Sequence, residues 1–195
     1  MSPRTVGCAS QAGSRCSDLS AVISDLPEVN DLSYPAPVRW LAAALAWWIR
    51  LPVPLRACLP PALMLFLWWS SSRQPTSGEA SAVKSFLHNG AHIVAYGALA
   101  TAWWTLLVRR VPPAHLGTAA WLVSVTYGVV DELHQAAVPG RTCSVTDLGS
   151  DAAGAWLAIL CLNWLYLQNG RARAMIPLAV CVAVIAVSLA TFVPV

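Results

Sequence analysis

Hydrophobic residues along the chain gather in long, almost unbroken runs instead of alternating with polar ones. Four such runs lie at about 55–71, 90–108, 115–133 and 147–167, and a fifth lies near 175–194. Each has about the 17 to 25 apolar residues that a helix needs to cross a bilayer. The pattern therefore predicts an all-α fold, a polytopic transmembrane helical bundle with about five spans.

The chain before these runs is of two kinds. Residues 1–37 are rich in Ser, Pro, Asp and Gly and lack a sustained hydrophobic period, which predicts a disordered polar tail instead of a cleaved signal. Residues 38–53 are apolar over only about a dozen positions, too short for a hydrocarbon core about 30 Å thick, so we expect an interfacial amphipathic segment that Pro52 and Pro54 end. Residues 54–167 would then form the main membrane domain, and 168–195 a C-terminal transmembrane helix.

Composition supports a membrane protein and argues against several other classes. Hydrophobic residues make up 57% of the chain and charged residues 11%, and the ten Trp suit anchoring at the headgroup level. The net charge of +3 comes mainly from scattered Arg, which argues against nucleic-acid binding. The six Cys have no metal-binding spacing, so we expect neither structural zinc nor another cofactor.

Positive charges near the helix ends predict the orientation of the bundle. One side would carry Arg39, Arg50, Arg56, Arg109, Arg110, Arg171 and Arg173, and the other Arg73, Lys84 and Arg141. Because positive loops tend to stay in the cytoplasm, the amino terminus is predicted to be cytoplasmic.

Ionisable side chains gather at the ends of three predicted spans. Asp131, Glu132, His134 and Gln135 close the third span, Arg141 follows it, and Asp147 and Asp151 share a face at the start of the fourth. At the start of the second span, the four-residue spacing of His88, His92 and Tyr96 places them on one face. Ionisable groups in a membrane are costly and usually face a protein interior or an aqueous cavity, so we expect a polar pocket at the extracytoplasmic face.

These residue types permit anion binding and proton transfer. Arg141 offers a planar, permanently charged fork for a phosphate or carboxylate, and the turn at Pro139-Gly140 can fold it back over the helix ends. His92 can exchange a proton near neutral pH, with Glu132 or Asp147 as its orienting partner or as a base.

Three separated motifs resemble the VanZ-like family of bacterial polytopic membrane proteins. They are His92-Ile-Val-Ala-Tyr96-Gly, then Tyr127-Gly-Val-Val-Asp-Glu132-Leu-His-Gln135, then Val138-Pro-Gly-Arg141 followed by Asp147 and Gly154. The resemblance covers about residues 88–160 and implies residence in the bacterial cytoplasmic membrane. The namesake is associated with teicoplanin resistance, and the likeness implies no particular reaction. The family pattern falls on His92, Tyr96, Glu132, Gln135, Arg141, Asp147 and Asp151.

Two positions depart from that pattern. A Lys is common in the family where this chain has Asn89, and an Asn is common where it has Asp151. The chain thereby loses a positive charge and gains a carboxyl group, which weakens the case for transferring any anionic ligand of the relatives.

We assign candidate catalytic roles to His92, Glu132 and Asp147, candidate ligand-binding roles to Tyr96, Gln135, Arg141 and Asp151, and no metal. The expected ligand is an anionic lipid headgroup or a lipid-linked cell-envelope precursor, and a homo-oligomer is left open. Each residue also has a structural interpretation: His92 with Tyr96 as an interhelical pair, and Glu132 with Arg141 as an ion pair between spans. Metal binding by His92 and His134 with the carboxylates is the less favoured alternative. On the structural interpretations the protein is a non-catalytic scaffold or a small transporter, and Ser150, Gly154 and Ala158 indicate close helix packing in any case.

Overall fold

The computed structural model describes residues 34–73, 82–141 and 143–192, and within these ranges the regular structure is entirely helical. This confirms the all-α prediction. The helices are α2 (Ala36–Arg50), α3 (Val53–Ala57), α4 (Leu59–Ser71), α5 (Ala82–Leu107), α6 (Pro113–Ala136), α7 (Val145–Leu167) and α8 (Gly170–Phe192). The predicted disordered tail falls outside the described residues up to position 33.

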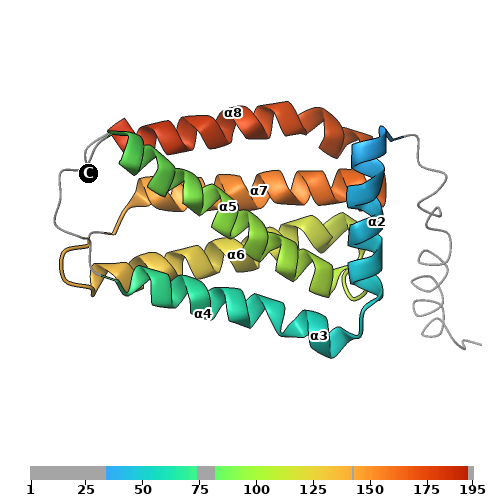
Figure 1. The fold of residues 1–195 in the computed structure, drawn as a ribbon, viewed down its shortest axis with the longest axis horizontal. Helices are drawn as coiled ribbons and strands as arrows, with labels where there is room; N and C mark the ends of the chain where they lie inside the picture. The colour runs from blue at the N-terminus through green and yellow to red at the C-terminus, as the bar shows by residue number, and fades with distance from the viewer. Residues whose placement is uncertain (1–33, 74–81, 142, 193–195) are drawn as a thin grey trace, which may run out of the picture.

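The long helices run side by side along the molecule, and α2 lies across one end of them (Figure 1). α7 lies between α6 and α8, and α5 crosses the bundle diagonally (Figure 1). We call the end that carries α2 the α2 end, and the opposite end, where α4 and α6 finish and α5 and α7 begin, the site end. That α2 lies in the membrane interface stays a prediction.

Three helical segments of the described chain are long and apolar enough to cross a membrane: Val53–Ser71, Val145–Leu167 and Gly170–Phe192. At 26 and 24 residues, α5 and α6 have sufficient length. They are less apolar over that length, since α5 begins with Lys84, His88, Asn89 and His92, and α6 ends with Asp131, Glu132 and His134.

Local sequence sets where the helices begin and end. Proline occupies the first or second position of α2, α3, α4 and α6, where its missing N–H group leaves no hydrogen bond unmade. The Ser144 hydroxyl caps α7 by accepting from the Asp147 backbone N–H. α7 ends at Gln168, whose φ of 55° lies in the left-handed region.

α5 and α7 approach closely where they cross. A Cβ atom placed on Gly154 would lie 2.3 Å from the Ile93 carbonyl oxygen, and one on Gly97 would lie 3.3 Å from the Gly154 carbonyl oxygen. Only glycine permits such an approach of two backbones, as expected for a small residue in a helix contact. This contact fixes the position of α5 along the length of α7. It therefore also fixes which side chains of the two helices lie opposite each other.

Candidate functional site

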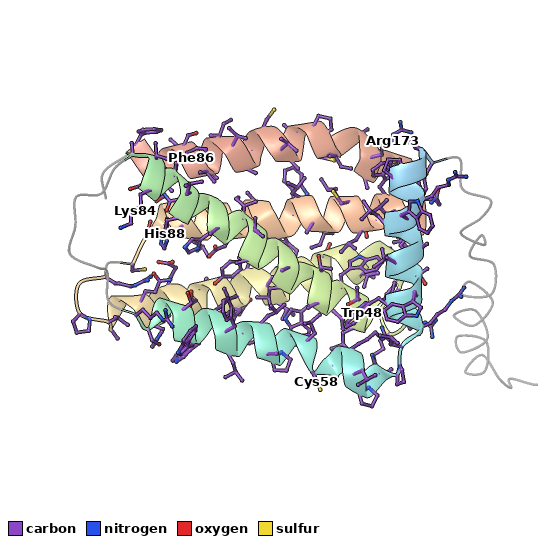
Figure 2. The ribbon with its side chains drawn as sticks, in the orientation of Figure 1. Trp48, Cys58, Lys84, Phe86, His88 and Arg173 are labelled. Carbon is purple, nitrogen blue, oxygen red and sulfur yellow. The ribbon has the colours of Figure 1, made fainter. Side chains whose placement is uncertain are left out.

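The ends of α4 and α6, the starts of α5 and α7 and the α6–α7 connection meet at the site end, where α8 ends as well (Figure 1). Lys84, Phe86 and His88 lie at this end, whereas Trp48 and Arg173 lie at the α2 end (Figure 2). The polar ends of the second, third and fourth hydrophobic runs predict that α5, α6 and α7 meet here. The contribution of α4 was not expected.

Asp131 joins α6 to α4 inside the bundle. Its Oδ1 accepts a hydrogen bond of 2.6 Å from the Ser71 hydroxyl, and its Oδ2 accepts one of 3.0 Å from Gln135 Nε2. The three side chains are all buried. Asp131 therefore has a partner for each carboxylate oxygen and fixes the end of α4 against α6.

Glu132 joins α6 to the α6–α7 connection in a similar way. Its Oε2 accepts a 2.7 Å bond from the Ser144 backbone N–H, and its Oε1 accepts a longer bond of 3.4 Å from Gln135 Nε2. Because Glu132 is only 3% exposed, its carboxylate has lost most of its hydration, and these two hydrogen bonds take the place of water. The geometry does not contain the Glu132–Arg141 ion pair that one structural interpretation assumed, because Arg141 bonds the neighbouring Gln135 instead.

Arg141 lies over the helix ends, as its position after the Pro139-Gly140 turn predicted. Gly140 has a φ of 81°, and the Arg141 N–H closes the turn on the Val138 carbonyl at 3.1 Å. The Arg141 side chain donates from Nη1 to Gln135 Oε1 at 2.9 Å and from Nε to the Arg73 carbonyl at 3.0 Å. Since a guanidinium carries five N–H groups, these two bonds position it while leaving donors for a ligand.

His92 and Asp151 form the direct contact between α5 and α7 in the site. His92 Nδ1 lies 2.9 Å from Asp151 Oδ1, and Asp151 is only 1% exposed. The orienting carboxylate of His92 is therefore Asp151, and the assignment of that role to Glu132 or Asp147 was wrong. The sequence pattern predicts a ligand-binding role for Asp151, whereas its place nearly two turns into α7 brings it opposite His92.

Two buried polar atoms next to this pair have no hydrogen-bond partner: the Tyr96 hydroxyl and Asp151 Oδ2. Tyr96 is 1% exposed, and its ring stacks parallel to the His92 ring with centroids 6.4 Å apart. A Cβ on Gly128 would lie 3.3 Å from both Asp151 Oδ2 and the Tyr96 ring, so only glycine leaves these groups their space. Because an unpaired buried polar atom is costly, such atoms call for an explanation, and a ligand is one.

A pocket of about 270 Å³ lies between α4, α5 and α6. Its walls include His88, His92, Tyr96, Asp131, Gln135 and Arg141, together with Ser70 and Ser71 of α4. Of the seven predicted site residues, the pocket wall contains His92, Tyr96, Gln135 and Arg141, whereas Asp151 supports His92 from behind. Glu132 and Asp147 lie outside the wall, and the half-buried Asp147 occupies the first turn of α7.

His134 and Asn89 point to other neighbours. The His134 ring stacks on Trp68 with centroids 3.6 Å apart, and its Nε2 lies 2.9 Å from the Ser72 hydroxyl. Asn89 is buried and donates to Thr191 of α8 at 3.1 Å. Asn89, where the family commonly has a Lys, thus contributes a hydrogen bond to α8 in place of a positive charge. Among the described residues, no three His, Cys, Asp or Glu gather as metal ligands.

The all-helical fold and its apolar, membrane-length segments are those of a membrane protein, and His92, Tyr96, Gln135 and Arg141 line a partly open pocket at one end of the bundle. A model of the VanZ/LLP1 family matches residues 41–166, which is more than half of the chain. The chain therefore belongs to the VanZ-like family. No curated protein and no solved structure is detectably similar to it. The match ends just before α8, so Asn89 contacts a helix outside the matched region.

Proposed function

We propose that the pocket at the site end binds the anionic headgroup of a membrane lipid or of a lipid-linked envelope precursor. The observation that carries this proposal is the unpaired hydroxyl of Tyr96, a fully buried donor in the wall of a pocket that also contains Arg141 and His92. Arg141 would contact a phosphate or carboxylate oxygen through its remaining N–H groups. The Tyr96 hydroxyl would donate to a second oxygen of the same ligand.

Gln135 separates Arg141 from Asp131, the carboxylate in the pocket wall. Asp131 lines the pocket, but both its oxygens accept hydrogen bonds from Ser71 and Gln135, and Gln135 in turn presents its carbonyl oxygen to Arg141. The amide thus lies between the Asp131 carboxylate and the guanidinium. Arg141 therefore forms no direct ion pair with Asp131, and its charge is available to a ligand.

The second part of the proposal is that His92 and Asp151 move a proton of the bound ligand. When Asp151 Oδ1 accepts from Nδ1–H, the ring keeps a lone pair on Nε2. A hydroxyl of the ligand would transfer its proton to Nε2, and the resulting imidazolium would be stabilised by the Asp151 carboxylate. Transfer of the proton from Nε2 back to an oxygen of the ligand would restore the neutral imidazole, so neither residue is consumed.

Native mass spectrometry of the purified protein tests the binding step. We expect the wild type to retain an anionic lipid or lipid-linked precursor, and Arg141→Ala to retain it about tenfold less or worse, because a charge-assisted hydrogen bond is lost. Arg39→Ala, which removes an exposed arginine of α2, is the matched control and should leave retention unchanged. Equal retention by both variants would contradict the proposal.

The second candidate function is that of a non-catalytic scaffold, which the bonds from Asp131 and Glu132 to α4 and the α6–α7 connection favour. A scaffold predicts that His92→Gln lowers the amount of folded protein. The binding function predicts that folded protein persists and that the lipid profile of the cells changes. Measuring folded protein and lipid profile in the same cells separates the two.

A further inference from the structure

A second cavity, about 640 Å³ in volume, lies on the other side of α7 from the α5 contact and is walled by α6, α7 and α8. Small residues of α7 form its floor, namely Gly149, Ala152 and Ala153, and Trp121 and Trp156 line it as well. We call it the α6–α8 groove. A Cβ on Gly149 would meet nothing within 4 Å, so this part of the floor is open.

The groove is long enough for an acyl chain. It contains Gly149 at the site end and Asn163 fourteen residues later along α7. At a rise of 1.5 Å per residue, this is about 21 Å. One leaflet provides about half of a hydrocarbon core about 30 Å thick, so a single chain entering from one leaflet fits within the groove.

The groove ends in positive charge at the α2 end. Asn169 is part of its wall, and the Asn169 Oδ1 accepts from the backbone N–H groups of Arg171 and Ala172. Arg171 is exposed and lies on the same helical face as Val182, another wall residue, because the positions 171, 175, 178 and 182 are separated by four, three and four. The intervening Met175 and Leu178 are exposed and apolar, so one face of α8 leads from a cation into an apolar channel.

No carboxylate of the described residues neutralises this end. The described Asp and Glu are Asp131, Glu132, Asp147 and Asp151, and all four belong to the site end, whereas seven Arg lie at the α2 end. Figure 2 shows Arg173 at this end beside α2. Charge complementarity therefore favours an anionic occupant whose headgroup stays at the α2 end.

We propose that the α6–α8 groove binds one anionic phospholipid of the leaflet at the α2 end, with an acyl chain over Leu160, Trp156 and Ala152 and its phosphate at Arg171. The two tryptophans enclose the chain. This site shares only α6 with the headgroup pocket, and its headgroup lies at the opposite end of the bundle. Neither proposal depends on the other.

Photo-crosslinking in nanodiscs tests the site. The probes are phosphatidylglycerol and phosphatidylcholine that carry the same diazirine-bearing acyl chain, each added to phosphatidylcholine nanodiscs that contain the full-length protein. We expect phosphatidylglycerol to label the α7 residues 152–160 about fivefold more than phosphatidylcholine does, as the attraction of one arginine for an anionic lipid implies. The outer face of α4 around the exposed Leu65 should show no such preference.

Two variants locate the two parts of the lipid. Arg171→Gln should remove the preference for phosphatidylglycerol and leave the labelling by phosphatidylcholine unchanged. Ala152→Leu should fill the groove and lower labelling by both lipids, whereas Gly90→Leu, at an open helical glycine of α5 outside the groove, should not.

Labelling of the groove and of α4 to the same extent by both lipids would reduce the groove to ordinary annular contact and overturn the proposal. A preference that survives Arg171→Gln would overturn it too. Crosslinks between two protein copies through residues 152–160, without lipid adducts there, would show that a second copy covers the groove instead. Because Arg171 is a surface residue, its substitution should not impair folding.

Discussion

The buried carboxylates of the site end differ in how many of their oxygens have partners. Asp131 and Glu132 each accept hydrogen bonds at both oxygens, whereas Asp151 uses Oδ1 for His92 and leaves Oδ2 unpaired. A fully bonded buried carboxylate contributes to stability, and a half-bonded one lowers stability relative to that arrangement. We therefore expect substitutions at these residues to separate structure from function.

Glu132→Gln should lower the free energy of unfolding by about 1–2 kcal/mol, because the bond from Ser144 N–H loses its charge and the new amide N–H groups meet the Gln135 Nε2 donor. Asp147→Asn is the control, since a half-buried carboxylate in the first turn of α7 contributes only about 0.3–1 kcal/mol through the helix dipole. Denaturant titration in micelles followed by tryptophan fluorescence measures both. A larger loss at Asp147 than at Glu132 would contradict this assignment.

Asp151→Asn should leave stability within about 1 kcal/mol of the wild type, because the amide oxygen can still accept from His92 Nδ1–H and the neutral amide nitrogen takes the place of a charged oxygen that has no partner either. The same change removes the charge that would stabilise an imidazolium, so a function that needs proton transfer should be lost. The measurement pairs thermal unfolding with the lipid profile of cells that carry the variant. Loss of folded protein would instead assign Asp151 a structural role.

At the scale of elements, the meeting of α5 and α7 determines whether His92 reaches Asp151. Gly154→Ala should lower the free energy of unfolding by about 1–3 kcal/mol, because its Cβ would lie 2.3 Å from the Ile93 carbonyl oxygen and force the helices apart. Gly149→Ala, in the same helix, meets nothing within 4 Å and should be neutral or stabilising by up to about 1 kcal/mol.

Histidine NMR provides the functional readout for this pair of glycine variants. The His92 ring signals should change in Gly154→Ala, because the contact with Asp151 lies one turn away from the glycine, and should stay unchanged in Gly149→Ala. Similar stability and spectra for the two variants would show that the close approach does not hold the site together.

Hydrophobic runs were sufficient to predict the number and order of the long helices, because each run is bounded by proline, glycine or charged residues that end it. The convergence of α5, α6 and α7 followed from the polar ends of those runs. The sequence could not show which carboxylate meets His92, since that depends on the crossing of α5 and α7 at Gly154. It also gave no sign of the role of α4, whose Ser71 hydroxyl bonds its own helix as well as Asp131 and resembles any serine at a helix end.

At the scale of the whole molecule, charge is divided between the two ends. Seven Arg lie at the α2 end, and the four described carboxylates lie at the site end with Arg73, Lys84 and Arg141. The distribution of Lys and Arg predicts that the α2 end faces the cytoplasm. The pocket and the positive end of the groove would then lie in opposite leaflets. The ligands proposed for the two sites depend on this orientation.

Cysteine labelling tests that orientation, and the chain already carries a suitable thiol. Cys143 is exposed in the connection between α6 and α7, at the site end. In a variant that keeps only this cysteine, a membrane-impermeant maleimide added to intact cells should react. An otherwise cysteine-free variant with Arg110→Cys, in the exposed turn between α5 and α6, should react only after the cells are permeabilised. If both thiols react in intact cells, the two ends do not face opposite compartments, and the bundle does not cross the membrane as we predict. If only the Arg110→Cys thiol reacts, the orientation is inverted and the pocket opens toward the cytoplasm, where envelope precursors in their exported form could not reach it.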